Sequence, residues 1–522
     1  AKKRKGLKKH APDSPINTAA KVATIEEQNV EPIFTDKPAL QTPTRTTSPK
    51  VASPKLKVAT PKQRREDGEI KGRIGSFPHP FVERPSPLSD RRHHGILNLI
   101  SMLLVAWLLV QMVTDYKRTG SFLDLTLAEA LLSGFPAMLV LSGCVIAGCA
   151  IMSIILETFM LINIDIKQTE INKKTTKKDV VTDIILCCSY VVAQFCVWFF
   201  SSWFATHLNM SPLCRGATCA QTFVMSMKMH SYFITNRYMR KHFHSNDNIH
   251  VVKDRFSNIA KQSVTKSVIH LTLDYINFVM SPTLVYEPNF PRTERIQWFE
   301  MIKQLLGFLI CCLIIYVSMQ KLMIPTMESL SYNVLEHVFY LAVPTMLLWM
   351  LAFYGIFHCL LNAVAEVSRF ADREFYLEWW DSTTMTEFWK LWNRAVYKWM
   401  CRHVYMESMR QVPLFNKKLA AISTYVTTAI LHEYLLCIAF VTFRPWFFGL
   451  IVLQIPFLYA VERFKGTRLG NMIMWLGFSA GLPIIELFYC YGYMKKNNVD
   501  ILDPLGKNNS TQEDSVLQYV TF

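Results

Sequence analysis

One long apolar run, residues 419–443, constrains this chain more than any other feature. At about 1.5 Å per residue it is long enough to cross a bilayer core of about 30 Å as a helix. His432 and Glu433 stand at its centre and would lie near mid-membrane depth. Placing an ionisable group there costs about 3 kcal/mol or more, so such residues usually face a bundle interior or a wet cavity. The run therefore predicts a membrane helix that carries a functional site.

The surroundings of this histidine can also be predicted from helical spacing. Thr424, Thr428 and His432 share one face of the helix, so the histidine has hydroxyl neighbours rather than lipid. Glu433 is expected to orient a neighbouring group or to pair with an arginine. A buried histidine that only hydrogen-bonds a neighbouring helix remains an alternative.

The composition divides the chain into an apolar body and a polar arm. Hydrophobic residues make up 51% of the chain, with 34 Phe and 12 Trp, which is typical of a polytopic membrane protein. Residues 1–92 contain half of the 24 Pro and carry 20 Lys or Arg against 10 Asp or Glu. We expect a disordered, basic cytosolic arm there. Most of the net charge of +16 therefore belongs to the arm and does not indicate nucleic-acid binding.

Nine apolar runs follow the arm, and the placement of Lys and Arg predicts their orientation. Basic short loops stay in the cytosol, and the segments 167–178 and 237–266 are both basic. Nine spans with a cytosolic N-terminus satisfy both, with 366–418 cytosolic and a short polar tail, 494–522, in the lumen. The predicted spans, of which the fourth and eighth are weak, are 95–114, 136–162, 181–205, 216–234, 301–319, 338–363, 419–443, 446–461 and 471–489.

The segment 369–405 is too polar to span a membrane and too aromatic for a free loop. Its five Trp alternate with Arg and Lys, a composition typical of an amphipathic segment at the membrane interface. One interpretation is that the rings are only interfacial anchors. The other is a site for a large anionic cytosolic substrate with a hydrophobic tail, because the segment leads into the helix that carries His432.

Three motifs in this region resemble those of a known family, the membrane-bound O-acyltransferases. FYLEWWD (375–381) resembles the FYxDWWN pattern of the sterol and diacylglycerol O-acyltransferase branch, LWN (391–393) its asparagine segment, and LHEYL (431–435) its histidine motif. The resemblance runs from about Phe81 to Tyr493, and the acyltransferase domain is predicted over residues 93–493. It implies an all-α polytopic fold with about nine transmembrane helices around an intramembrane reaction chamber. It also implies an endoplasmic reticulum membrane location and a homodimer or homotetramer. Glu378 and Asp381 depart from the pattern.

Different motifs indicate different acceptor lipids. MKMHSY (227–232) and VTDYKRTGSFLDL (113–125) resemble the sterol enzymes, whereas FADREFY (370–376) and PTLVYEPNFPR (282–292) resemble the diacylglycerol enzymes at least as closely. We predict transfer of a long-chain acyl group from acyl-CoA to a sterol, with diacylglycerol as the alternative acceptor. A transporter whose intramembrane histidine relays protons is a more distant alternative, but no internal repeat supports it.

The resemblance also implies roles for individual residues. His432 is expected to act as the base for the acceptor hydroxyl, because an imidazole is largely neutral at pH 7. Asn393 is expected to donate to the thioester carbonyl or to hold the acceptor, and a well-aimed oxyanion donor contributes roughly 10²–10³ in rate. No metal and no cofactor beyond the co-substrate acyl-CoA are expected. The predicted acyl-CoA contacts, for which anchoring and packing remain alternatives, are Phe375, Tyr376, Trp379, Trp380, Tyr405, Lys417 and Thr428.

Four further residues give weaker predictions. His230 is expected to support the chamber, and His358 is expected to be structural. Cys214 and Cys219 flank a predicted lumenal turn, and a disulfide between them is one interpretation. The other cysteines are interpreted as small buried apolar residues.

Overall fold

The computed structural model describes residues 87–89, 91–163, 177–242, 264–328, 334–411 and 416–493. Most of the predicted arm and the whole predicted tail lie outside these residues. The described part of the chain is built of helices, with a single isolated β-bridge between Arg292 and Phe370. The prediction of an all-α polytopic membrane fold is confirmed.

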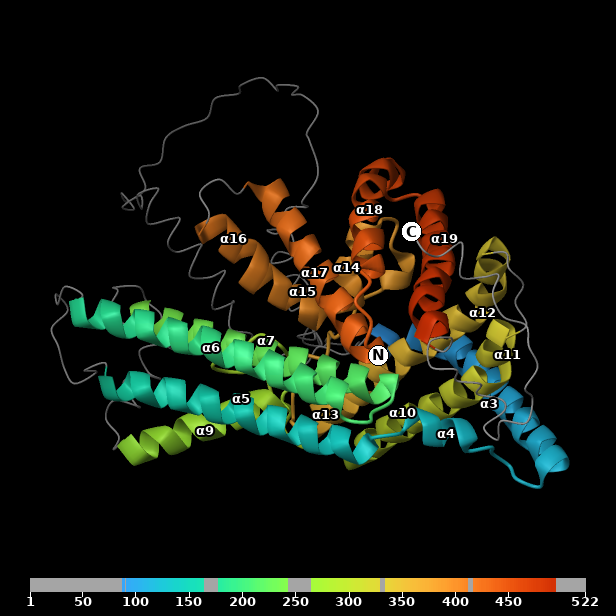
Figure 1. The fold of residues 1–522 in the computed structure, drawn as a ribbon, viewed down its shortest axis with the longest axis horizontal. Coiled ribbons are helices and arrows are strands. Elements are labelled where there is room, and N and C mark those ends of the chain that lie inside the picture. The colour runs from blue at the N-terminus through green and yellow to red at the C-terminus, as the bar shows by residue number, and fades with distance from the viewer. Residues whose placement is uncertain are drawn as a thin grey trace, which may run out of the picture.

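Figure 1 shows the arrangement of the described helices. In chain order they are α3 (Arg91–Thr119), α4 (Thr126–Leu131), α5 (Phe135–Asn163), α6 (Lys177–His207), α7 (Pro212–His242), α9 (Val264–Met280), α10 (Trp298–Ser318), α11 (Ile324–Glu328), α12 (Val334–Phe353), α13 (Leu361–Val367), α14 (Met385–Trp392), α15 (Arg394–Met400), α16 (Met406–Gln411), α17 (Lys417–Phe440), α18 (Trp446–Val461) and α19 (Arg468–Glu486). Short 3₁₀ turns lie at η1 (Pro87–Ser89), η4 (Trp379–Asp381) and η6 (Glu462–Phe464).

Several helices continue into wider π-helical turns, which occur frequently at functional sites. In the described residues they are η2 (Met319–Met323), η3 (Tyr354–Leu360), η5 (Cys401–Tyr405) and η7 (Leu487–Tyr491). The turn η5 follows α15 and lies in the segment 369–405, which the sequence predicted to be functional, whereas η7 follows α19.

Seven described helical segments are long and apolar enough to cross a membrane, and they coincide with seven of the nine predicted spans. They are Leu97–Thr119, Thr126–Met160, Val180–His207, Trp298–Glu328, Leu335–Val367, Lys417–Phe440 and Arg468–Cys490. The two weak predictions differ from these. The span 216–234 lies in α7, which is long but polar, and the apolar part of α18, Trp446–Leu458, is short.

Helix α7 is polar because it lies inside the bundle. It packs against α5, α6, α9 and α17, and α6 and α7 run side by side in Figure 1. Lys228 is buried and donates from Nζ to three carbonyl oxygens at the end of α9, those of Phe278, Val279 and Ser281, at 2.8, 3.0 and 2.7 Å. A cation at a helix C-terminus satisfies carbonyls that have no partner within the helix. Lys228 therefore joins α7 to α9, and its ammonium group is satisfied without contact with water.

The proposed disulfide between Cys214 and Cys219 is wrong. Both residues lie on α7, both are buried, and both are free thiols. The chain does not turn between them, because α7 already begins at Pro212.

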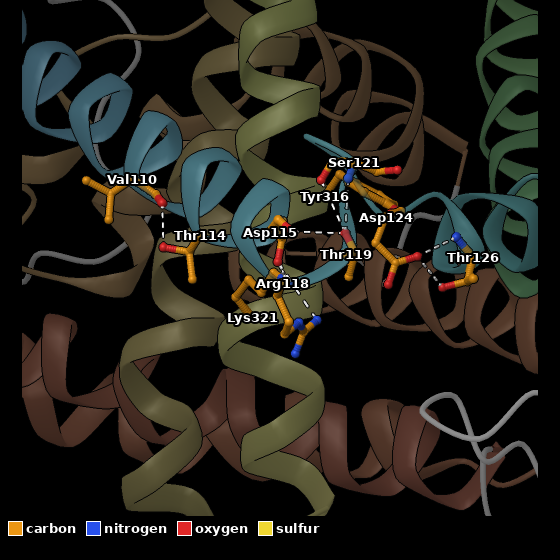
Figure 2. Close-up of polar contacts among 10 residues, drawn as sticks. All are labelled: Val110, Thr114, Asp115, Arg118, Thr119, Ser121, Asp124, Thr126, Tyr316 and Lys321. Carbon is orange, nitrogen blue, oxygen red and sulfur yellow. Dashed lines mark hydrogen bonds and ion pairs between the residues drawn. The ribbon is translucent and has the colours of Figure 1, made fainter.

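Helix α3 is attached mainly near its C-terminal end (Figure 2). Asp115 is 4% exposed and pairs with Lys321 of η2 at 2.7 Å. The Tyr316 hydroxyl of α10 donates to the carbonyl oxygen of Asp124, in the loop that follows α3. Toward its N-terminus, α3 exposes large apolar side chains such as Met102 and Leu103, which suits a lipid-facing surface.

An aromatic core joins α12, the segment around η4, α14 and α19. Trp379 is fully buried at its centre, and Trp349 and Trp392 stack with ring centroids 4.3 Å apart. Phe388 and Phe478 close the cluster with centroids 4.5 Å apart. Buried aromatic side chains contribute much of the packing energy of a core. The aromatic core therefore fixes the corner between α14 and α15, where Asn393 lies.

Candidate active site

His432 lies on α17 and is oriented by its own helix. Its Nδ1 lies 2.8 Å from the carbonyl oxygen of Thr428, one turn earlier. Because a carbonyl can only accept, Nδ1 carries the proton, and in the neutral ring Nε2 presents a free lone pair. The side chain is exposed, and its ring stacks on Phe447 with centroids 5.3 Å apart. This tautomer is the one that a base acting through Nε2 requires.

The next residue, Glu433, points into the protein and holds a different element. Its carboxylate accepts a hydrogen bond from the Tyr489 hydroxyl at 2.6 Å and one from the Phe448 backbone N–H at 2.9 Å. Phe448 lies in the first turn of α18, and the N-cap residue Pro445 supplies no side-chain cap. A carboxylate is favourable at a helix N-terminus, so Glu433 caps α18 from α17. The prediction that Glu433 orients a neighbour is confirmed.

Asn393 lies at the corner between α14 and α15 and is half-buried. Its Oδ1 accepts from the Val396 backbone N–H at 3.1 Å, which makes Asn393 the N-cap of α15. This bond fixes the orientation of the amide plane and leaves the two N–H groups of Nδ2 as donors. The helix start therefore aims an amide donor away from α15.

The motif at residues 375–381 holds this asparagine through the backbone. The Leu377 N–H donates to the carbonyl of Leu391 at 2.9 Å, and the Arg394 N–H donates to the carbonyl of Phe375 at 2.9 Å. The two bonds bracket Asn393 on both sides. Sequence reasoning treated the two motifs as separate, and their hydrogen-bonded pairing is the feature that it missed.

The side chains of this motif are packed inside the aromatic core. Phe375, Tyr376 and Trp379 are 3%, 0% and 0% exposed. The Tyr376 hydroxyl lies 2.7 Å from Nδ1 of His358, which agrees with a structural role for that histidine. Trp380 is half-buried, and its carbonyl accepts from the Asn471 amide at 2.9 Å. Direct acyl-CoA contact by these aromatic residues stays a prediction, and their burial favours a supporting role.

The other three predicted contact residues are more accessible. Tyr405 ends η5 and is half-buried, Lys417 is the exposed first residue of α17, and Thr428 is half-buried one turn before His432. The Thr428 hydroxyl donates back to the carbonyl of Thr424 at 3.0 Å. Only Thr428 is thus brought directly against His432, through its carbonyl oxygen.

Asn393 and His432 reside on separate elements that approach each other. In the described residues no hydrogen bond links their side chains. Helix α17 packs against η5, the turn that ends the segment beginning at Asn393. The structure therefore places His432 on a helix that contacts this segment, at the end opposite to Asn393.

Some basic residues of the interfacial segment are already paired with acids. Lys398 lies 3.1 Å from Asp372, and Arg402 lies 3.3 Å from Glu287. Burial raises the pKa of Glu287 and lowers the pKa of Arg402, while each partner opposes these shifts. These ion pairs hold the segment in place.

The two departures from the family pattern lie at the surface. Glu378 and Asp381 are both exposed. The acid at position 381 therefore does not place a carboxylate in a buried amide site, and its substitution is compatible with the fold.

Comparison with known proteins gives the class of the chain. The model of the membrane-bound O-acyltransferase family, MBOAT, matches residues 95–491. The chain therefore belongs to the membrane-bound O-acyltransferase family, as its motifs predicted.

Three of its curated relatives are named as diacylglycerol O-acyltransferases. The chain is 37% identical over 232 residues to human diacylglycerol O-acyltransferase 1, which covers 43% of this chain and 47% of the human protein. It is 34% identical over 231 residues to diacylglycerol O-acyltransferase 1-2 of rice, covering 42% and 48%. The match to diacylglycerol O-acyltransferase 1C of soybean has 30% identity over 293 residues, covering 53% and 55%. The chain thus spans about half the length of the curated relatives it matches, and they favour the alternative acceptor over the sterol.

Proposed function

We propose that this protein transfers a long-chain acyl group from acyl-CoA to the hydroxyl of diacylglycerol and so forms triacylglycerol. The observation that carries the proposal is the fixed tautomer of His432, whose Nε2 is free while Nδ1 is bonded to the Thr428 carbonyl. Similarity to diacylglycerol O-acyltransferases supports the choice of acceptor. A sterol acceptor remains the second candidate, because MKMHSY resembles the sterol enzymes.

The proposed reaction needs no covalent enzyme intermediate, since a thioester is already activated. Nε2 of His432 takes the proton of the acceptor hydroxyl while the hydroxyl oxygen attacks the thioester carbon. The amide N–H of Asn393 stabilises the developing oxyanion. The C–S bond then breaks, CoA leaves as a thiolate, and the thiolate takes the proton from the imidazolium. The histidine is thereby restored to its starting state.

The surrounding residues serve binding and position in this proposal. Tyr405 and Lys417 would contact acyl-CoA at the cytosolic side, and Thr428 would line the site beside His432. Phe375, Tyr376 and Trp379 would act indirectly by holding Asn393. An endoplasmic reticulum membrane, a cytosolic N-terminus and a homo-oligomer remain parts of the proposal. A chamber within the membrane would limit access of water to the thioester.

The test uses the purified full chain in lipid nanodiscs with labelled oleoyl-CoA and either diacylglycerol or a sterol. We expect labelled triacylglycerol from diacylglycerol and little steryl ester. Steryl ester as the main product would show that the acceptor is a sterol, the second candidate. Labelled product from neither lipid would overturn the acyltransferase proposal and favour a protein without this chemistry.

A further inference from the structure

Helix α7 contacts both segments that carry the predicted catalytic residues. Toward α17, Arg215 donates from Nη1 to the carbonyl of Ala439 at 3.2 Å, and the rings of Phe223 and Tyr434 lie 6.0 Å apart. Gly216 also lies close to Ala439, since a Cβ at Gly216 would come within 3.5 Å of the Ala439 Cβ. These contacts set the position of the helix that carries His432.

On the other side, α7 contacts the segment that runs from α15 into η5. Trp399 donates from its indole nitrogen to the carbonyl of Met227 at 2.9 Å. One turn further along α7, the Ser231 hydroxyl lies 2.9 Å from Nε2 of His403, and the rings of His230 and His403 meet edge to face at 5.0 Å. Asn393 caps the start of this segment and Tyr405 ends it. The position of Asn393 therefore depends on α7.

The Ser231 hydroxyl joins three elements at one point. It is fully buried, and besides His403 it accepts a hydrogen bond from the Tyr286 backbone N–H at 2.8 Å. Tyr286 belongs to the loop between α9 and α10, and Arg402 of η5 pairs with Glu287 in the same loop. Loss of this hydroxyl would remove one hydrogen bond between α7 and the loop and one between α7 and η5.

His230 is itself held in one orientation by α6. Gln194 donates to the Tyr190 hydroxyl at 3.0 Å, and this hydroxyl lies 2.6 Å from Nδ1 of His230. Since the Tyr190 oxygen accepts from Gln194, its own proton is available for Nδ1. The hydrogen bond from Tyr190 of α6 therefore fixes the orientation of the His230 ring, which contacts His403 at its other side.

We infer that the α7 residues 227–231 hold Asn393 in position relative to His432. Ser231 and His403 are the positioning residues. Neither residue touches the reacting atoms, and both act through the segment that Asn393 begins. The inference rests on the proposed function, because it assigns a catalytic consequence to the packing. It gives the MKMHSY motif a role that the reaction itself does not require.

The first test asks whether Ser231 holds the segment, with no need for activity. Ser231→Ala is compared with Ser318→Ala, which removes an equally buried hydroxyl from α10. We expect faster amide hydrogen exchange in residues 393–405 for Ser231→Ala only. Unchanged exchange there would overturn the inference even if the protein proves to have another function.

The second test links the position to catalysis. Misplacement by about 1 Å can lower a rate by about 100-fold, so we expect Ser231→Ala to lower kcat about 10- to 100-fold per folded molecule, with KM for diacylglycerol nearly unchanged. In an Asn393→Ala background the same substitution should cost no further kcat, because it acts through Asn393. A normal kcat for Ser231→Ala, or additive losses in the double variant, would overturn the inference. A wild-type protein without transferase activity would instead overturn the proposed function.

Discussion

The aromatic motif and the histidine helix both belong to the signature of the family, yet they are built in opposite ways. In the motif, Tyr376 and Trp379 are fully buried, and the backbone on both sides is hydrogen-bonded to the turn that carries Asn393. In α17, His432 is exposed, and within the described residues its hydrogen bond comes from its own helix and its ring contact from Phe447. In the proposed reaction, one segment presents the base, and the other supports the residue that stabilises the oxyanion.

This difference predicts two kinds of variant. A residue that supports a site through its packing should lower the free energy of unfolding when truncated. An exposed residue that reacts should lower turnover and leave stability nearly unchanged. Measuring stability and activity together therefore tests whether the structure has assigned each motif correctly.

The largest effect is expected for His432→Ala. It removes the proposed base, and general-base catalysis contributes about 10²- to 10⁴-fold, so turnover of acyl-CoA and diacylglycerol should fall by that factor. The melting temperature should change little, because the side chain is exposed. Product formation is measured with labelled oleoyl-CoA, and unfolding by a thermal scan of the same sample.

His207→Ala is the matched control, since His207 is also an exposed histidine and lies at the end of α6. It should retain wild-type turnover. If His432→Ala retained turnover as well, His432 would not be the catalytic base. The proposed difference in role between the two motifs would then be wrong.

The next effect is expected for Trp379→Ala. Truncation of a fully buried tryptophan leaves a cavity in the aromatic core and should lower the free energy of unfolding by about 3–5 kcal/mol. Trp380→Ala, at a half-buried position, should cost less. If Trp379→Ala instead kept its stability and raised only the KM for acyl-CoA, Trp379 would contact the substrate as the sequence predicted.

A smaller effect is expected for Glu433→Ala, which tests whether Glu433 has a different role from its neighbour His432. It leaves the Phe448 N–H without its acceptor, whereas the Tyr489 hydroxyl keeps the Arg444 carbonyl at 2.9 Å, and the expected cost is about 1–3 kcal/mol in the free energy of unfolding. Turnover should fall only modestly, through the looser position of Phe447 against His432. Glu433→Gln keeps one acceptor oxygen and should recover part of the stability. A loss of turnover as large as that of His432→Ala would give Glu433 a direct catalytic role.

Much of the fold was predictable because membrane spans depend on length and apolar composition alone. Seven predicted spans coincide with suitable helices, and residues 419–443 correspond to α17 with a short extension. Length and apolar composition could not show whether α7 is a membrane span or a helix buried inside the bundle. Its Lys228 satisfies carbonyls at the end of α9, and such a partner 50 residues away leaves no local signal in the sequence.

The site was predictable in its residue types and less so in their roles. Composition cannot separate a tryptophan at the membrane interface from one in a core, because the same large amphipathic ring suits both. Trp379 and the half-buried Trp380 are adjacent and differ only in which side of η4 they occupy. Likewise, the contact of Ser231 with His403 joins residues 172 positions apart, so only the three-dimensional structure identifies it.

The smallest effect is expected for Asp381→Asn, which restores the amide of the family pattern in the aromatic motif. Because the side chain at position 381 is exposed, the change should alter the free energy of unfolding by no more than about 0.5 kcal/mol. Turnover should stay within about 2-fold of wild type for the same reason. Both are measured in the assays used for His432→Ala. A clear gain in turnover would mean that an amide at this edge of the motif contacts substrate, and the motif would then combine support with binding.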